Sequence, residues 1–365
     1  MTGKVFEKMI GAAATADGRK QEQREGDMSK FFARAALAAA LCLGAASAQA
    51  QDKVRVSFNP QIYSWLPFFL AIDKGYFKAE KLDVEYVTYG GSALSQIPML
   101  ARGDQDIAGM VTGPGFFNQY AEGFGVKLIA SNAQGKDGWN DTSWLMVRKD
   151  LWDSGKIKTF ADMKGYKVEG GPKGSPVYLT TTEAMKQGGL TMKDVEFTER
   201  LRAVTDALPI FKNKGADFLS IVEPIVTRLE VEGLAVRWKA SYEVMPWFQE
   251  SYLAANPKFL ETKRDVAKRF LRAYFKACQD ITAGGGKWTD ETLTAVVKWS
   301  KFPKEVIEKI KGPQHCGQYG RIDTASIERQ QEIWMQAGLV KEKTPLAKMV
   351  DTSIVDEVRT EMGIK

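Results

Sequence analysis

The sequence has few of the side chains with which enzymes bind metals or form covalent intermediates. It contains one histidine, His315, and three cysteines in 365 residues. A single histidine cannot build a multi-histidine metal site. His315 adjoins Cys316, but catalytic Cys–His pairs are usually brought together by the fold, so neighbours in sequence are weak evidence for a nucleophile. We therefore expect no catalytic group, no metal and no cofactor.

Clustered charge and nucleotide-binding motifs are also absent. The 51 Lys and Arg against 45 Asp and Glu give a net charge of +6, without a run of five like charges. Nucleic-acid-binding proteins need clustered positive charge. In the loop "GGPKGSPVYL", residues 170–179, Lys173 precedes Gly174, whereas a Walker loop needs its lysine directly after the glycine. We expect neither a nucleic acid nor a nucleotide as partner.

One apolar run stands near the N-terminus, and no second run of that kind follows. The stretch "MSKFFARAALAAALCLGAASAQAQ" begins at Met28 with positive residues and is apolar over residues 35–46. This run is too short to span a membrane, which takes about 20 apolar residues, but is typical of a secretory signal. We expect a signal peptide over residues 28–50 that is cleaved before Gln51, and release without a lipid anchor. Residues 1–27 are interpreted as a non-native upstream extension.

Export would place the two remaining cysteines in an oxidising compartment. A disulfide between Cys278 and Cys316 is then one possibility. The alternative is that Cys278 is a core residue, because it shares one helical face with four apolar residues: Val266, Phe270, Tyr274 and Ile281. The sequence leaves both open.

The rest of the chain alternates predicted strands and helices. "VRVSFNP" and "LDVEYVTY" are strands, and "LPFFLAIDKGYFKAE" between them is a helix with Pro67 near its first turn and Gly75 closing it. A further helix is expected over residues 93–102. Such βαβ units build α/β folds. We expect two lobes with central mixed sheets, joined by two crossings and separated by a cleft. The first lobe comprises residues 51–142 and 243–365, and the second residues 143–242.

Ligands of open α/β sheets bind outside the carboxyl ends of the strands, where helix N-termini offer free N–H groups. The loops after the strands therefore supply the candidate ligand-binding residues. In the first lobe these are Tyr63, Ser64, Trp65, Gly91, Ser92, Thr112 and Asn132. In the second lobe they are Lys173, Gly174, Ser175 and Glu223.

Several of these residues have an alternative interpretation. The loop around Ser175 either holds a polar or anionic ligand through its N–H groups and hydroxyl, or is a tight turn whose glycines serve geometry alone. Glu223 either reaches the cleft or caps its own helix. Tyr63, Trp65 and Phe116 either stack on a ligand or pack in the core of a lobe.

Five short motifs, in order and at matching spacing, resemble one family over roughly residues 53–280. They are the K-G-Y-F-x-x-E turn at Lys74 to Glu80, G-S-A at Gly91 to Ala93, the run Met163 to Val168, Gly174-Ser175, and Gly215 to Asp217 before Glu223-Pro224. The chain resembles the periplasmic substrate-binding proteins of ABC importers for nitrate, taurine, alkanesulfonates and thiamine-precursor pyrimidines.

The resemblance implies a type II periplasmic binding protein fold that closes on a small-molecule ligand. It implies a monomer in the periplasm that delivers this ligand to an ABC permease with its ATPase. It also assigns ligand contacts to matching loop positions, namely Ser64, Trp65, Ser92, Thr112, Asn132, Ser175 and Glu223.

Two departures from the family bear on the ligand. The loop "NPQIYSWLPFF" lacks the histidine of the pyrimidine-precursor binders, and the cysteine cluster of the fungal pyrimidine synthases is absent. Both argue against a thiamine-precursor role. A sulfonate, carboxylate or aromatic acid suits loops of hydroxyl, amide and aromatic side chains. The alternatives are a secreted pyrimidine-synthase-like enzyme on the same fold, and a ligand-sensing accessory protein.

Overall fold

The structure is a computed structural model that describes residues 51–87, 93–136, 139–316 and 318–364. The expected signal peptide and upstream extension, and the candidates Gly91 and Ser92, lie outside these residues. The chain from Asp52 onward forms one compact unit. Within the described part, no helix is long and apolar enough to cross a membrane.

The first sheet has five strands in the order β2-β1-β3-β10-β4. Their bounds are β1 Asp52–Ser57, β2 Leu82–Tyr86, β3 Ile107–Val111, β4 Lys127–Gln134 and β10 Gln249–Ala255. β1 is parallel to β2 and β3, whereas β10 lies antiparallel between β3 and β4. The strand added by the returning chain therefore makes this sheet mixed.

The second sheet repeats this arrangement in the order β7-β6-β8-β5-β9. Its strands are β5 Ser143–Arg148, β6 Lys167–Glu169, β7 Glu196–Thr198, β8 Phe218–Val222 and β9 Ala235–Ala240. β6 is parallel to β7 and β8, and β5 lies antiparallel between β8 and β9. Two mixed sheets joined by two crossings confirm the predicted fold class.

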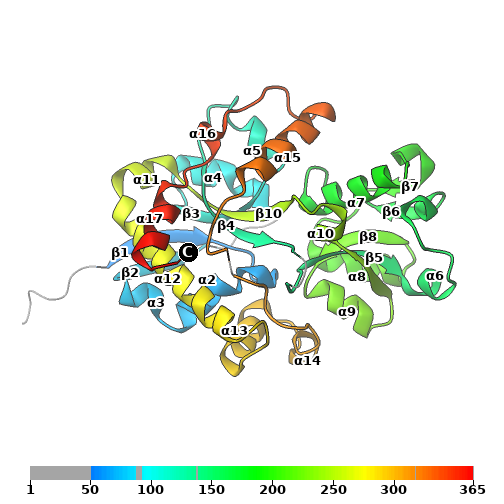
Figure 1. Cartoon of the computed structure of the whole chain (residues 1–365), viewed down its shortest axis with the longest axis horizontal. Coiled ribbons are helices and arrows are strands. Elements are labelled where there is room, and N and C mark those ends of the chain that lie inside the picture. Colours follow the sequence, from blue (N-terminus) through cyan, green and yellow to red (C-terminus); the bar gives the residue numbers. More distant parts are fainter. Residues whose placement is uncertain (1–50, 88–92, 137–138, 317, 365) are drawn as a thin grey trace, which may run out of the picture. The chain divides into compact units, whose positions relative to one another are not determined.

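The helices cover both sheets (Figure 1). Those before the first crossing and after the return are α2 Leu66–Asp73, α3 Tyr76–Ala79, α4 Ile97–Arg102, α5 Pro114–Asn118, α11 Pro257–Thr262, α12 Arg264–Ala283, α13 Asp290–Ser300, α14 Lys304–Ile307, α15 Thr324–Gln336, α16 Leu346–Met349 and α17 Ser353–Glu361. Those between the crossings are α6 Lys149–Asp153, α7 Pro176–Gln187, α8 Ala207–Lys212, α9 Ile225–Val231 and α10 Ser241–Val244. Short 3-10 turns are η1 Tyr63–Trp65, η2 Ala93–Gln96, η3 Phe160–Met163, η4 Met192–Asp194 and η5 Val204–Asp206.

The strands of the first sheet bury side chains on both faces. Successive side chains of a strand point to opposite faces, and here Ile107 and Leu253 join one apolar cluster while Ala108 and Ala254 join another. The first cluster contains the aromatic rings of α2 and α12, and the second those of α5 and α15. A sheet covered on both sides leaves the strand ends as the place for a ligand.

Local sequence explains where two of the first helices begin and end. α2 carries Pro67 in its first turn and stops before Gly75, whose φ of +70° ends the helix, as predicted. The helix expected over residues 93–102 is instead a 3-10 turn followed by α4 from Ile97. Pro98 explains the change, because proline lacks an N–H and is tolerated only in the first turn of an α-helix.

A disulfide joins Cys278 of α12 to Cys316, with their Cα atoms 5.3 Å apart. Cys278 is 2% exposed and lies in the core on the apolar face of α12. Both interpretations that the sequence left open are therefore correct, because Cys278 forms the disulfide and is also a core residue.

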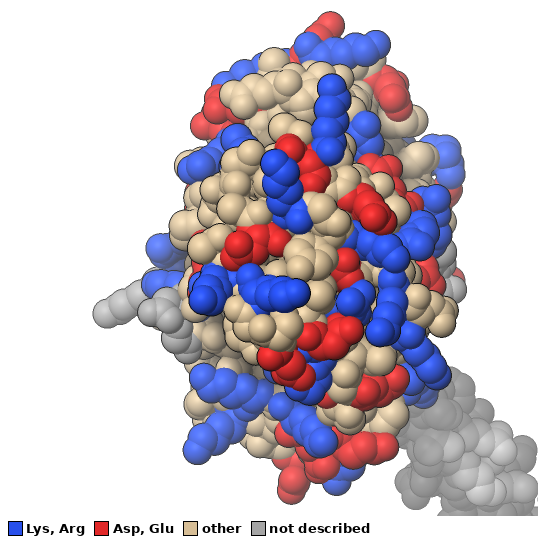
Figure 2. All heavy atoms as spheres, turned by 90° about the vertical axis from the view of Figure 1, so that its right-hand side faces the viewer, with Lys and Arg blue, Asp and Glu red and all other residues tan. Residues whose placement is uncertain are grey.

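Basic and acidic side chains are interspersed over the face of the molecule that Figure 2 shows, without a patch of one sign. This agrees with the scattered charge of the sequence. The face shown therefore has no positively charged patch of the kind that binds a nucleic acid.

Candidate functional site

A cavity of about 600 Å³ is lined by loops that belong to both sheets. From the first sheet and the helices around it come Phe58, Asn59, Pro60, Gln61, Ile62, Ser64, Trp65, Tyr86, Ala93, Val111, Glu250, Ser251, Trp299, Ser300 and Lys301. From the second come Pro172, Ser175, Pro176, Leu201, Arg202, Ala203, Val204 and Val222. The volume is in the range of sites for small organic ligands.

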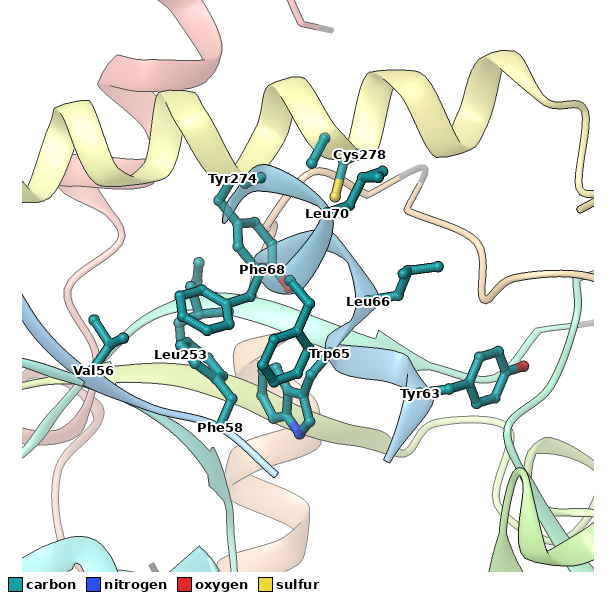
Figure 3. Close-up of a cluster of buried hydrophobic side chains, with 14 of the residues drawn as sticks. Val56, Phe58, Tyr63, Trp65, Leu66, Phe68, Leu70, Leu253, Tyr274 and Cys278 are labelled. Atoms are coloured by element: carbon teal, nitrogen blue, oxygen red, sulfur yellow. The ribbon is translucent and has the colours of Figure 1, made fainter. Parts of the chain in front are cut away.

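Aromatic rings form one wall of this cavity. Trp65 belongs to η1, directly after the loop that follows β1, and its ring lies 4.9 Å from that of Phe58 (Figure 3). Gly109 on β3 makes room for both rings, because a Cβ atom there would come within 2.7 Å of Trp65 and 2.9 Å of Phe58. Trp65 is 4% exposed, so it is both a core residue and a cavity wall.

Two serines add hydroxyl groups to the wall, and Asn132 orients them. The Asn132 amide donates to Ser251 Oγ at 3.1 Å and to Ser64 Oγ at 3.5 Å. Its carbonyl oxygen accepts a hydrogen bond from the Tyr274 hydroxyl at 2.7 Å. Asn132 itself does not line the cavity, so the structure gives it a positioning role.

The glycine-rich loop of the second sheet contributes Ser175. This residue is the N-cap of α7, and its Oγ accepts from the Tyr178 N–H at 3.2 Å while the residue borders the cavity. Gly174 has a φ of +84°, and a Cβ atom there would lie 2.7 Å from Pro114 Cδ. Lys173 is exposed and outside the cavity lining. Gly174 therefore allows the positive φ and the close approach to Pro114 that this loop needs, whereas Ser175 borders the cavity.

Three further predicted residues are turned away from the cavity. The Thr112 hydroxyl donates to Gln330, and Tyr63 is buried beside Trp288 with its hydroxyl unpaired. Glu223 accepts from the Thr227 N–H at 3.0 Å and so caps its own helix, α9. None of the three lines the cavity. Phe116, the third aromatic residue of the prediction, is fully buried in the core.

Glu223 is instead held in a buried ion pair. Arg237 on β9 donates to Glu223 Oε1 at 2.5 Å and also pairs with Glu230. Burial raises the pKa of Glu223, whereas Arg237 and the hydrogen bonds from Thr227 act in the opposite direction. This cluster fixes the start of α9, next to β8.

Three charged residues of the cavity were not predicted from the sequence: Arg202, Glu250 and Lys301. Glu250 lies at the start of a strand, whereas the predicted positions lie in loops after strands. β10 runs antiparallel to its neighbours, so its first residues lie beside the last residues of β3 and β4: Ser251 pairs with Val111 and Gln249 with Gln134. The start of an antiparallel strand thus reaches the edge where ligands bind.

The comparisons with known proteins agree with this architecture. The family model "NMT1/THI5 like" matches residues 63–284, from η1 to the end of α12. The chain belongs to the NMT1/THI5-like family. This family membership confirms the resemblance drawn from the sequence motifs.

Individual relatives are distant. YtlA of Bacillus subtilis, whose name proposes a binding function, is 24% identical over 323 residues, which cover 85% of this chain and 90% of YtlA. The periplasmic aliphatic sulphonate binding protein SsuA of Escherichia coli has a TM-score of 0.66 at 18% identity, covering 82% of this chain and 92% of SsuA. The desulfurization enzyme DSZB has a TM-score of 0.61 at 13% identity, covering 86% and 100%. The fold is thus shared by a binding protein and an enzyme.

Proposed function

We propose that this NMT1/THI5-like protein is a non-catalytic solute receptor of the periplasm. It binds a small anionic organic ligand, a sulfonate, carboxylate or aromatic acid, as a monomer and delivers it to an ABC permease with its ATPase. The observation that carries the proposal is the cavity of about 600 Å³ lined from both sheets. Its described lining contains no cysteine and no histidine, which favours binding over covalent chemistry.

The second-sheet side of the cavity is suited to an anion. α7 has 12 residues and begins at the cavity, so its N-terminal N–H groups and partial positive charge face a bound ligand. Arg202 borders the cavity on the same side, and Lys301 borders it from the first-sheet side; both are exposed, and neither has an ion pair with another described residue. A ligand carboxylate or sulfonate would pair favourably with either cation.

The aromatic wall is suited to the apolar body of such a ligand. Phe58, Trp65 and Trp299 offer rings on the first-sheet side. A ligand held between these rings and Ser175 contacts both sheets at once. Contacts made only in the closed arrangement favour that arrangement, which is how a hinged receptor couples binding to closure.

A thermal-shift panel tests the proposed function. Residues 51–365 are screened against sulfonates, carboxylates, aromatic acids, nitrate and pyrimidines, because a ligand that binds only the folded state raises the unfolding midpoint. We expect a rise with an organic anion and unchanged ligand after long incubation. An unchanged unfolding midpoint with every compound of the panel, or chemical conversion of a ligand that binds, would contradict the proposal.

Replacing Ser175 by alanine is expected to weaken binding of the anion by at least about tenfold, because a hydrogen bond to a charged group contributes about 1.5–3 kcal/mol. The measurement is the dissociation constant by titration calorimetry. Loss of the N-cap also costs roughly 1 kcal/mol of stability, so Thr289→Ala, which removes the N-cap of α13 away from the cavity, is the matched control. Equal affinities of Ser175→Ala and Thr289→Ala for the ligand would show that Ser175 does not contact the ligand.

A further inference from the structure

A carboxyl group without a partner faces the cavity. Glu250, the second residue of β10, borders it and has no hydrogen bond or ion pair from its side chain to any described residue. The lining of the same cavity includes the rings of Phe58 and Trp65. Glu250 is half-buried, so its carboxylate loses part of its hydration without gaining an opposite charge, which is costly.

A β-bulge turns this side chain toward the cavity. Gln249 pairs with Gln134 and Ser251 with Ala133, so Glu250 is the extra residue that has no partner on β4. In a regular strand two successive side chains point to opposite faces, yet Glu250 and Ser251 both line the cavity. Bulges re-aim side chains in this way and are frequent at functional sites. The bulge in β10 therefore directs the Glu250 side chain toward the cavity.

The charged and titratable groups around Glu250 do not neutralise it. Asp141, in the segment before β5, is the charged neighbour that acts on it, and Tyr63 is a buried neutral hydroxyl. Arg202 and Lys301 are exposed cations at the same cavity. Burial raises the pKa of Glu250 to about 8, and Asp141 acts in the same direction. In the ligand-free protein the carboxyl therefore favours its protonated form at pH 7.

We propose that Glu250 binds a protonated amino or amidino nitrogen of the ligand. This inference rests on the proposed function and deepens it. The ligand is then zwitterionic, with its acid group at Ser175 and Arg202 and its cationic nitrogen at Glu250. Such a ligand pairs with Arg202 on the second-sheet side and with the Glu250 carboxylate on the first-sheet side, whereas a simple anion lacks a group that pairs with Glu250.

Pairing with a cation has a defined proton balance. The neutral Glu250 carboxyl loses its proton to solvent when the ligand's ammonium group takes its place as the partner of the carboxylate. Binding at pH 7 is therefore accompanied by net release of protons, at most one per ligand. The affinity rises with pH, by up to about tenfold per unit, until Glu250 is ionised without ligand near pH 8, and then levels off.

Isosteric probe pairs test the inference by titration calorimetry in buffers of different ionisation enthalpy. The pairs are 4-(aminomethyl)benzoate with 4-ethylbenzoate, and 3-aminopropane-1-sulfonate with butane-1-sulfonate, in which only the ammonium and methyl groups differ. We expect the amine of at least one pair to bind about thirtyfold tighter or more, with proton release. Glu250→Gln is expected to abolish both the preference and the release. Glu122→Gln, at an exposed carboxylate outside the cavity, keeps both.

A separate measurement excludes unfolding as the cause of lost binding. Because the pKa of Glu250 is raised in the folded state from 4.5 to about 8, the ligand-free protein loses stability as the pH rises through this range, and the loss is complete above pH 8. Ligand-free Glu250→Gln should therefore unfold at or above the wild-type midpoint at pH 8.5.

Each outcome assigns the result to one of the two claims. Equal binding of both members of every pair by the wild type, or an amine preference that survives Glu250→Gln, would overturn the inference and leave the anion receptor standing. If no probe and no member of the thermal-shift panel binds, the inference and the proposed function fall together.

Discussion

Replacing Arg237 by leucine is expected to lower the free energy of unfolding by about 3–5 kcal/mol, the cost of leaving a buried charge without its partner. Glu223 is 1% exposed, and Arg237 is its cationic partner. The measurement is equilibrium urea unfolding. Arg228→Leu is the matched control, because Arg228 pairs with Glu232 across a half-exposed surface, where an ion pair contributes less than about 1 kcal/mol.

The pH dependence of this variant has a definite sign. Without Arg237, burial raises the folded-state pKa of Glu223 further above its unfolded value, so the native state binds the additional proton. The loss of stability should therefore be greatest near pH 8 and smaller near pH 5. A loss no greater than that of Arg228→Leu, or one independent of pH, would contradict the role given to this pair.

Removal of the Cys278–Cys316 disulfide is expected to cause the second large loss of stability. The bond closes a loop with a sequence separation of 38, for which the chain-entropy model gives about 4 kcal/mol. We expect reductant to lower the thermal midpoint of the wild type by several degrees. The double variant Cys278→Ser with Cys316→Ser should unfold at the lower midpoint with or without reductant. A wild-type midpoint that does not respond to reductant would contradict the pairing.

The disulfide also bears on the binding site. Cys278 and Cys316 border a small hollow that Asn132 and Tyr274 also line. Asn132 orients Ser64 and Ser251 at the cavity, and its own carbonyl oxygen is held by Tyr274 of α12. Reduction would therefore loosen the support of these serines as well as the fold.

Much of the fold followed from local patterns in the sequence. Alternating strands and helices, Pro67 and Gly75 at the ends of α2, and the apolar face of α12 were readable because each depends on neighbouring residues. The 3-10 turn before α4 was not predicted, although Pro98 is the local signal for it. The two lobes were also expected from the alternation of strands and helices, and the family resemblance added the type II binding fold.

The site was less predictable, because it depends on strand direction and on distant contacts. Ser64, Trp65 and Ser175 were expected and line the cavity. Thr112 and Glu223 also follow strands, but Gln330 and Arg237, distant in sequence, hold their side chains elsewhere. Glu250 reaches the cavity because β10 runs antiparallel to its neighbours and carries a bulge. Neither feature can be recognised from the local sequence.

The proposed function requires that one small ligand occupies the cavity between the two sheets. Titration calorimetry of Ala203→Trp tests it most directly, because Ala203 is an exposed residue of the cavity lining, where added bulk fills the cavity without disturbing a core. We expect one ligand per wild-type chain, loss of binding in Ala203→Trp, and an unchanged thermal midpoint without ligand. Wild-type affinity in Ala203→Trp would place the ligand outside this cavity and contradict the proposed function.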